Sequence, residues 1–156
     1  MLRHQSESLY DKDTQQLRER LDRNGLLPAI VDLGWVDEAD LSLLLRVPDA
    51  AIYLMDDTLI NRSKCPVKLA DLIAAGVPVA AEDVGQVSEY VINGVTGFLR
   101  PTGDIAGLTD SISFLMQDKK KCMDFSQAAQ EHYAANFAWD HLAARLDDVY
   151  QTLITH

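Results

Sequence analysis

The sequence predicts an α/β fold in which helices flank a parallel β-sheet. Two observations support this prediction: short apolar runs suited to buried strands recur along the chain, and helical segments of about ten residues lie between them. Right-handed crossovers join the parallel strands of such folds. The chain has 156 residues, of which 47% are hydrophobic, so we expect one core and a single domain over residues 1–156.

The amino-terminal part of the chain predicts a helix, a strand and a second helix. Residues 13–24 are mostly charged, with leucines four apart, and Gly25 stands where a helix would end. The apolar run 29–33 is too short for a helix and predicts a buried strand. Asp37 can cap the next helix, which the turn at 47–49 stops.

The middle of the chain predicts two strands joined by a helix. Residues 51–55 form an apolar run that suits a buried strand, and a polar loop over 56–64 follows. A helix between Pro66 and Gly76 fits the preference for proline at the start and glycine just past the end. Residues 78–81 predict the third strand.

The carboxyl-terminal part predicts a fourth strand and a series of helices. Residues 88–92 indicate a short helix, and residues 97–100 indicate a strand after a turn. Asp104 and Asp118 can each cap a longer helix. The last helix is expected to begin near Trp139.

Charge and composition exclude several classes of protein. A net charge of −10 is unsuited to tracking a nucleic-acid backbone. Cys65 and Cys122 lack metal-ligand spacing, so they predict neither a disulfide framework nor a zinc site. No signal-like or membrane-spanning apolar run occurs. We expect a cytoplasmic protein, and a peripheral position at the inner membrane surface is compatible with that.

Candidate ligand-binding residues follow the strand at 51–55, because ligands of parallel sheets bind at the carboxyl ends of the strands. Arg62, Lys64 and Lys68 are cations around the start of the helix at Pro66. The backbone N–H groups of a helix start favour an anion, and cations crowded there are best explained by a bound phosphate. This segment therefore predicts an anion-binding site.

Asp71 lies three residues after Lys68, on the same face of the predicted helix. The two side chains can serve a ligand, or they can form a structural ion pair that only solubilises this face; both interpretations stay open. Glu82 and Asp83, directly after the third strand, are expected to be solvated or to cap the backbone.

Three segments, in this order and spacing, resemble one protein family: VDLGWV, then PDAAIYLM, then NRSKCPVKLADLIAAGVPVAAEDVGQVSEYVINGVTGFLRPTGD. Over about residues 17–153 the chain resembles the GT-B glycosyltransferases of group 1 (family 4), which retain anomeric configuration. The resemblance implies a Rossmann-like domain that binds a nucleotide sugar, the carboxyl-terminal half of a two-domain enzyme. The first strands of that domain lie ahead of the match, so we expect a domain incomplete at its amino-terminal side. Through the resulting sheet edge the chain is expected to self-associate, unless its amino-terminal segment covers it.

The resemblance also implies roles for particular residues. Of two family glutamates eight positions apart, the second, which binds the ribose hydroxyls, is matched by Asp71. The first, which faces the transferred sugar, is replaced here by Ser63. Val36 matches a position whose backbone meets the nucleobase edge, although an ordinary strand-to-helix turn is equally compatible. Gly85 and Glu89 match the loop that approaches the donor phosphates. A branch of the family has a basic arrangement in the donor loop, which is matched here by Asn61, Arg62, Lys64, Pro66 and Lys68.

The implied reaction is transfer of a hexose from a UDP-, GDP- or ADP-linked donor to an acceptor hydroxyl with retention. Arg62, Lys64 and Lys68 would act as catalytic residues that stabilise the departing diphosphate, without a bound metal. An amino-terminal domain or a partner chain would bind the acceptor. The chain could be a fragment of such an enzyme or one of its two polypeptides. Because Ser63 departs from the family pattern, a non-catalytic nucleotide-sugar-binding or interaction module is the alternative.

Overall fold

The structure is a computed structural model that describes residues 14–34 and 36–154. The chain divides into two compact units, Met1–Asp37 and Glu38–His156. In the first unit residues 14–23 are helical, and Gly25 follows with a φ of +66°, which suits the end of a helix. The first predicted helix is therefore confirmed over the residues that the structure describes.

The strand predicted over residues 29–33 is not formed. The 3₁₀ helix η1 (Leu27–Ala29) occupies its start, and the residues that follow run without a neighbouring strand. Ile30 and Val31 are 50% and 79% exposed. A strand is stabilised by hydrogen-bonded neighbours, and no ladder partner for this segment lies within the described part of the chain. The prediction from apolar composition alone is therefore wrong.

A parallel sheet forms the centre of the second unit, and its strands lie in the order β1 (Ala51–Tyr53), β2 (Val79–Glu82) and β3 (Gly97–Arg100). Tyr53 pairs with Ala81, which pairs in turn with Leu99 of β3. The carboxyl ends of all three strands therefore lie together at one end of the sheet. The predicted α/β fold with a parallel sheet is confirmed, although β1 is shorter than the apolar run 51–55.

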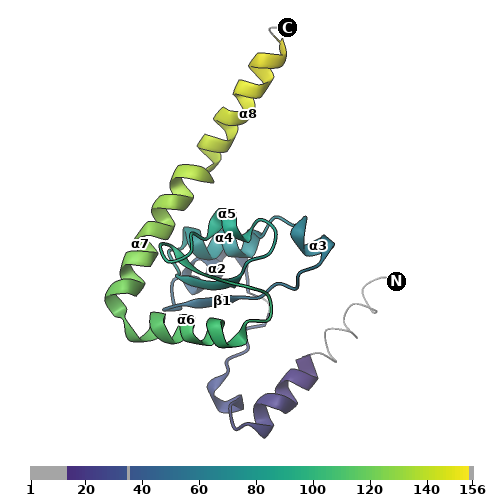
Figure 1. The fold of residues 1–156 in the computed structure, drawn as a ribbon, viewed down its shortest axis with the longest axis vertical. Helices are drawn as coiled ribbons and strands as arrows, with labels where there is room; N and C mark the ends of the chain where they lie inside the picture. Colours follow the sequence, from purple (N-terminus) through teal and green to yellow (C-terminus); the bar gives the residue numbers. More distant parts are fainter. Residues whose placement is uncertain (1–13, 35, 155–156) are drawn as a thin grey trace. The chain divides into compact units, whose positions relative to one another are not determined.

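Helices cover both faces of this sheet (Figure 1). The helices of the second unit are α2 (Glu38–Leu44), α3 (Leu59–Arg62), α4 (Val67–Ala74), α5 (Val87–Tyr90), α6 (Ile105–Gln117), α7 (Lys119–Asn136) and α8 (Trp139–Ile154). In Figure 1, α4 and α5 lie on one side of the sheet and α6 on the other, and α7 contacts both α4 and α6. Asp104 and Asp118 each accept a backbone N–H at 2.9 Å, so both predicted caps are confirmed.

The core of the second unit is built around β2 and α4. β2 is buried throughout, and Leu69 and Ile73 of α4 are at most 1% exposed. In contrast, Ile52 at the centre of β1 is 55% exposed. The fully buried strand predicted at 51–55 is thus half-buried, because β1 is an edge strand of the described sheet and has fewer neighbours than β2. Across the described ranges, no helix has both the length and the apolarity needed to cross a bilayer.

Candidate functional site

The segment between β1 and α4 brings several predicted site residues together. Residues 56–64, predicted as a loop, contain one helical turn, α3, which Thr58 caps by accepting the N–H of Asn61 at 3.2 Å. The loop prediction is wrong at this point because a threonine cap stabilises a turn that is too short to show helical periodicity. This turn places Asn61 and Arg62 directly ahead of α4.

Asn61 ties the two ends of this segment together. Its side-chain amide donates to the carbonyl oxygen of Asp56 at 2.9 Å, and its side-chain oxygen accepts a hydrogen bond from the Lys64 ammonium at 2.8 Å. The position of the Lys64 charge is therefore set by Asn61. These contacts unite two of the residues that the sequence placed in one site.

Arg62 is held by a carboxylate of the same segment. Its guanidinium donates two hydrogen bonds to the carboxylate of Asp57, the second at 2.7 Å. This bonding lowers the pKa of Asp57 below its ordinary value and raises the pKa of Arg62. The side chains are 60% and 43% exposed for Arg62 and Asp57, so an incoming phosphate can reach the guanidinium but must compete with Asp57 for it.

Gly85 brings the loop after β2 against the same segment. Its φ is +57°, and a Cβ atom there would lie 2.6 Å from the carbonyl oxygen of Arg62. Only glycine tolerates both the backbone conformation and this close approach. In the same segment, the hydroxyl group of Ser63 donates a hydrogen bond to the carbonyl oxygen of Ile60 at 2.9 Å. Gly85 and Arg62 are therefore neighbours.

Lys68 and Asp71 lie on the exposed side of α4. The opposite side of this helix, with Leu69 and Ile73, faces the core. Lys68 and Asp71 are both exposed, and the ion pairs of the described residues do not include one between them. The purely structural ion pair considered from the sequence is therefore not formed. Both side chains stay open to a ligand.

The remaining predicted site residues are less closely connected to this segment. Glu89 is exposed on α5, and its backbone carbonyl accepts a hydrogen bond from the His132 ring at 2.8 Å. α5 contacts α4, which places Glu89 on a helix next to the one with Asp71. Val36 belongs to the first unit, so its contact with a nucleobase stays a prediction.

Tyr90 lies beneath the start of α4. Its hydroxyl is 3.6 Å from the sulfur of Cys65, and its ring stacks on Phe137 with ring centroids 4.2 Å apart. Burial raises the pKa of Tyr90 to about 12, and the hydrogen bond with Cys65 contributes to the same shift. Tyr90 therefore supports the segment from the core side as a neutral phenol.

Glu82 caps backbone N–H groups, which is one of the two interpretations considered from the sequence. It was expected to be solvated or to cap the backbone, yet it is only 6% exposed. Its two carboxylate oxygens accept the N–H groups of Met55, at 2.8 Å, and Gly103, at 2.7 Å. The solvated interpretation is wrong, because the side chain points across the strand ends and not away from the sheet. In the sequence, its position as the last residue of an apolar strand could have indicated that the side chain is buried.

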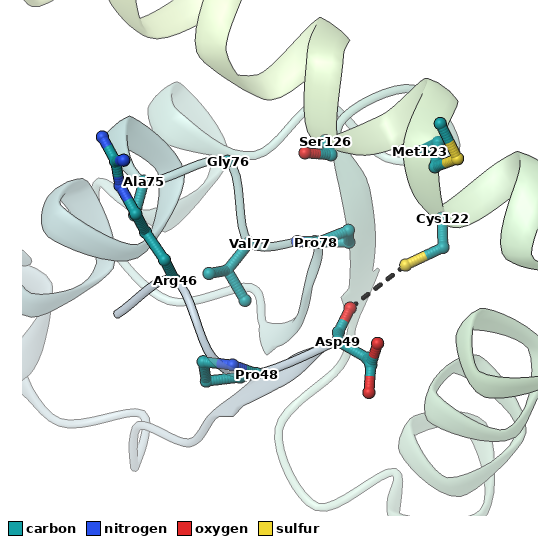
Figure 2. A pocket seen from close by; sticks show the side chains of 10 residues that line it. All are labelled: Arg46, Pro48, Asp49, Ala75, Gly76, Val77, Pro78, Cys122, Met123 and Ser126. Carbon is teal, nitrogen blue, oxygen red and sulfur yellow. Dashed lines mark hydrogen bonds between the residues drawn. The ribbon is translucent and has the colours of Figure 1, made fainter. Parts of the chain in front are cut away.

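Two hollows open at opposite ends of the sheet. One, of about 560 Å³, opens beside the carboxyl ends of the strands and is lined by Asp57, Asp83, Asn93, Leu99, Arg100, Pro101 and Thr102. The other, of about 220 Å³, lies at the amino ends, where Pro78 precedes β2. In Figure 2 the Cys122 side chain points toward Asp49, whose carbonyl oxygen accepts from the thiol at 3.1 Å. Only the first hollow adjoins residues 56–64, the cationic segment that contains Arg62 and Lys64, and it does so through Asp57.

Comparison with known proteins identifies the class. Residues 10–132 match the family model of the group 1 glycosyl transferases. The match covers more than half of the chain, and the chain therefore belongs to this family. A phosphatidyl-myo-inositol mannosyltransferase of Mycobacterium leprae is 29% identical over 143 residues, which are 92% of this chain and 36% of that protein.

A second relative agrees with this assignment, and two solved structures share the fold. A glycogen synthase of Mycobacterium tuberculosis is 29% identical over 88% of this chain and 32% of its own length. A sucrose-phosphate synthase from Thermosynechococcus elongatus superimposes with a TM-score of 0.76 and 20% identity, over 92% of this chain and 35% of that one. Anabaena HepE in complex with UDP gives a TM-score of 0.74 and 22% identity, over 89% and 36%. The fold is that of GT-B glycosyltransferases, and this chain spans about a third of the length of these relatives.

Proposed function

We propose that this chain is the donor-binding part of a retaining glycosyltransferase and that it binds a nucleoside-diphosphate hexose at the start of α4. One observation supports this most directly. Arg62 and Lys64 lie on the segment that leads from the carboxyl end of β1 into α4, and Lys68 and Asp71 lie on the exposed side of α4. That end of a parallel sheet is where nucleotides bind. The solved HepE complex contains UDP, which supports the same class of donor here.

The three cations suit the diphosphate. Lys64 lies just before α4 and Lys68 lies in its first turn, where backbone N–H groups add to the positive potential. As the sugar leaves, negative charge develops on the β-phosphate, and fixed cations stabilise it more in the transition state than in the ground state. Arg62 contributes once a phosphate displaces Asp57. Among the described side chains no three His, Cys, Asp or Glu residues gather as a metal-binding group, and independence from a metal remains a prediction.

The other predicted residues complete the proposed donor site. Asp71 accepts hydrogen bonds from the ribose hydroxyls, with a reach one methylene shorter than that of a glutamate. Gly85 keeps the loop after β2 close to the phosphates, and Glu89 borders the same loop. Asn61 orients Lys64.

Catalysis by the whole protein requires an acceptor site as well. Because the chain spans about a third of its relatives' length, we propose that an amino-terminal domain or a partner chain supplies that site. The second candidate function is donor binding without transfer. Ser63 favours it, because its hydroxyl is occupied by the carbonyl of Ile60 and no carboxylate stands at this position.

Calorimetric titration with UDP, GDP and ADP tests the donor site. We expect one of the three to bind, and Asp71→Ala to weaken it by about tenfold or more, since hydrogen bonds to a charged group are worth about 1.5–3 kcal/mol. Asp124→Ala is the matched control, because Asp124 is also an exposed helix residue of α7 outside the site. Failure of all three nucleotides to bind, or an equal loss in both variants, would contradict the proposal.

Release of nucleoside diphosphate from the donor sugar distinguishes the two candidate functions. If this chain is one of the two polypeptides of an enzyme, we expect turnover only when the acceptor-binding polypeptide is added. Binding without turnover in the presence of that partner would favour the non-catalytic module.

A further inference from the structure

Glu82 is a buried ionisable residue in the middle of the sheet's carboxyl end. Among the described residues, the buried polar side chains are Glu82, Thr96 and Ser111, and only the first is ionisable. Burying a carboxyl group costs free energy unless hydrogen bonds replace its hydration. The hydrogen bonds of Glu82 must therefore offset the cost of its burial.

Those contacts join the chain at three strand ends. Glu82 is the last residue of β2. Its Oε2 accepts the N–H of Met55, shortly after β1, and its Oε1 accepts the N–H of Gly103, shortly after β3. One side chain thus fixes the segments that leave all three strands of the described sheet.

The hydrogen bond to Met55 connects Glu82 with the cationic segment. Met55 precedes Asp56, whose carbonyl oxygen accepts from the Asn61 amide at 2.9 Å. Asn61 in turn accepts from the Lys64 ammonium at 2.8 Å. A displacement of the Met55 peptide would therefore move the acceptor that positions Asn61, and through it the charge of Lys64.

We propose that Glu82 is a positioning residue for the donor site: its carboxylate holds residues 55–64 in the conformation that presents Lys64 to the diphosphate. The identity of the ligand rests on the function proposed above, whereas the placement of the segment does not. Glu82→Gln keeps the shape but offers an amide N–H₂ group to one of two N–H donors, so that one hydrogen bond is lost. Glu82→Asp is too short to span both donors.

Amide hydrogen exchange tests the placement independently of any nucleotide. In Glu82→Gln we expect the amides of residues 55–64 to exchange about tenfold faster or more, while those around Phe125 in α7 keep their rates. Ser111→Ala is the control, because it removes another buried hydrogen-bonding side chain and is expected to leave residues 55–64 unchanged. Unchanged exchange over 55–64 in Glu82→Gln, or an equal increase along the whole chain, would overturn the proposal.

A double-mutant cycle tests whether Glu82 acts through Lys64. With the nucleoside diphosphate that binds best, Glu82→Gln is expected to weaken binding about tenfold in the native background and less than about twofold in Lys64→Ala. Fully additive losses would mean a general structural effect and would overturn the positioning role. If the native chain binds none of UDP, GDP and ADP, the proposed function fails and the exchange experiment alone decides the role of Glu82.

Discussion

Gly85 lies directly against the backbone of Arg62: a Cβ atom at Gly85 would come within 2.6 Å of the Arg62 carbonyl oxygen and 2.7 Å of its Cα. The loop after β2 and the segment after β1 therefore touch through main-chain atoms, with no side chain between them. Such a contact requires glycine, and it sets how closely the cationic segment approaches the loop after β2.

Replacing Gly85 is expected to destabilise the protein more than replacing a glycine with the same backbone conformation in open space. Gly94 has a φ of +77°, and a Cβ atom added there would meet nothing within 4 Å, so Gly94→Ala should cost only the conformational penalty of about 1–3 kcal/mol. Gly85→Ala should cost about 1–3 kcal/mol more, because the new methyl group overlaps the Arg62 backbone. Urea unfolding of the two variants measures the difference. Equal losses would show that the close approach is relieved without cost.

Asp57 is expected to weaken phosphate binding by occupying Arg62. Asp57→Asn removes the acceptor charge that holds the guanidinium, so nucleoside diphosphate affinity should rise several-fold. Asp56→Asn is the matched control: it removes the same charge one residue earlier, from a side chain that does not pair with Arg62. Calorimetric titration compares the two. The same gain in both variants would mean that only overall charge matters, and that Arg62 does not contact the phosphates.

The free energy of unfolding is expected to fall in alkaline solution because of Tyr90. The ordinary tyrosine pKa is about 10, and in the folded protein that of Tyr90 is raised to about 12. The stabilisation from the neutral phenol is therefore complete below about pH 10 and is lost as the pH rises toward about 12. Unfolding midpoints across this range should decline less steeply in Tyr90→Phe, which keeps the ring on Phe137. Tyr150→Phe, at an exposed residue of α8, should decline as the native protein does; an identical slope in all three would refute the assignment.

The edge strand β1 is expected to be covered in solution, either by a second copy of the chain or by the amino-terminal segment. β1 ends the described sheet, and Ile52 and Leu54 are 55% and 60% exposed, a combination that favours association. Analytical ultracentrifugation should detect a concentration-dependent dimer that Ile52→Lys weakens, or a monomer whose β1 amides exchange slowly. A monomer with rapidly exchanging β1 amides would contradict this prediction.

Local signals in the sequence predicted much of the fold. Asp104 and Asp118 cap helices, Gly76 ends α4 with a φ of +78°, and β3 spans the predicted residues 97–100. Each of these features depends on residues within one or two helical turns. Sequence patterns at that range are therefore sufficient to locate them.

Features that depend on distant residues were missed. The apolar run 29–33 suits a strand, but strand formation requires a neighbour that the local pattern does not reveal. Glu82 is buried because its partners Met55 and Gly103 lie 27 and 21 residues away in the sequence. The pairing of Arg62 with Asp57, which are only five residues apart, was missed for a different reason: it depends on α3, a turn too short to show helical periodicity. The candidate site was thus predicted by residue identity, while its internal contacts required the fold.

Nitrogen-15 chemical-shift mapping during titration with UDP, GDP and ADP locates the nucleotide on the protein. We expect the nucleotide that binds to shift the amide signals of residues 61–72, with further shifts around Gly85. Shifts confined to the hollow at the amino ends of the strands, around Arg46 and Asp49, would contradict it, as would unchanged spectra with all three nucleotides.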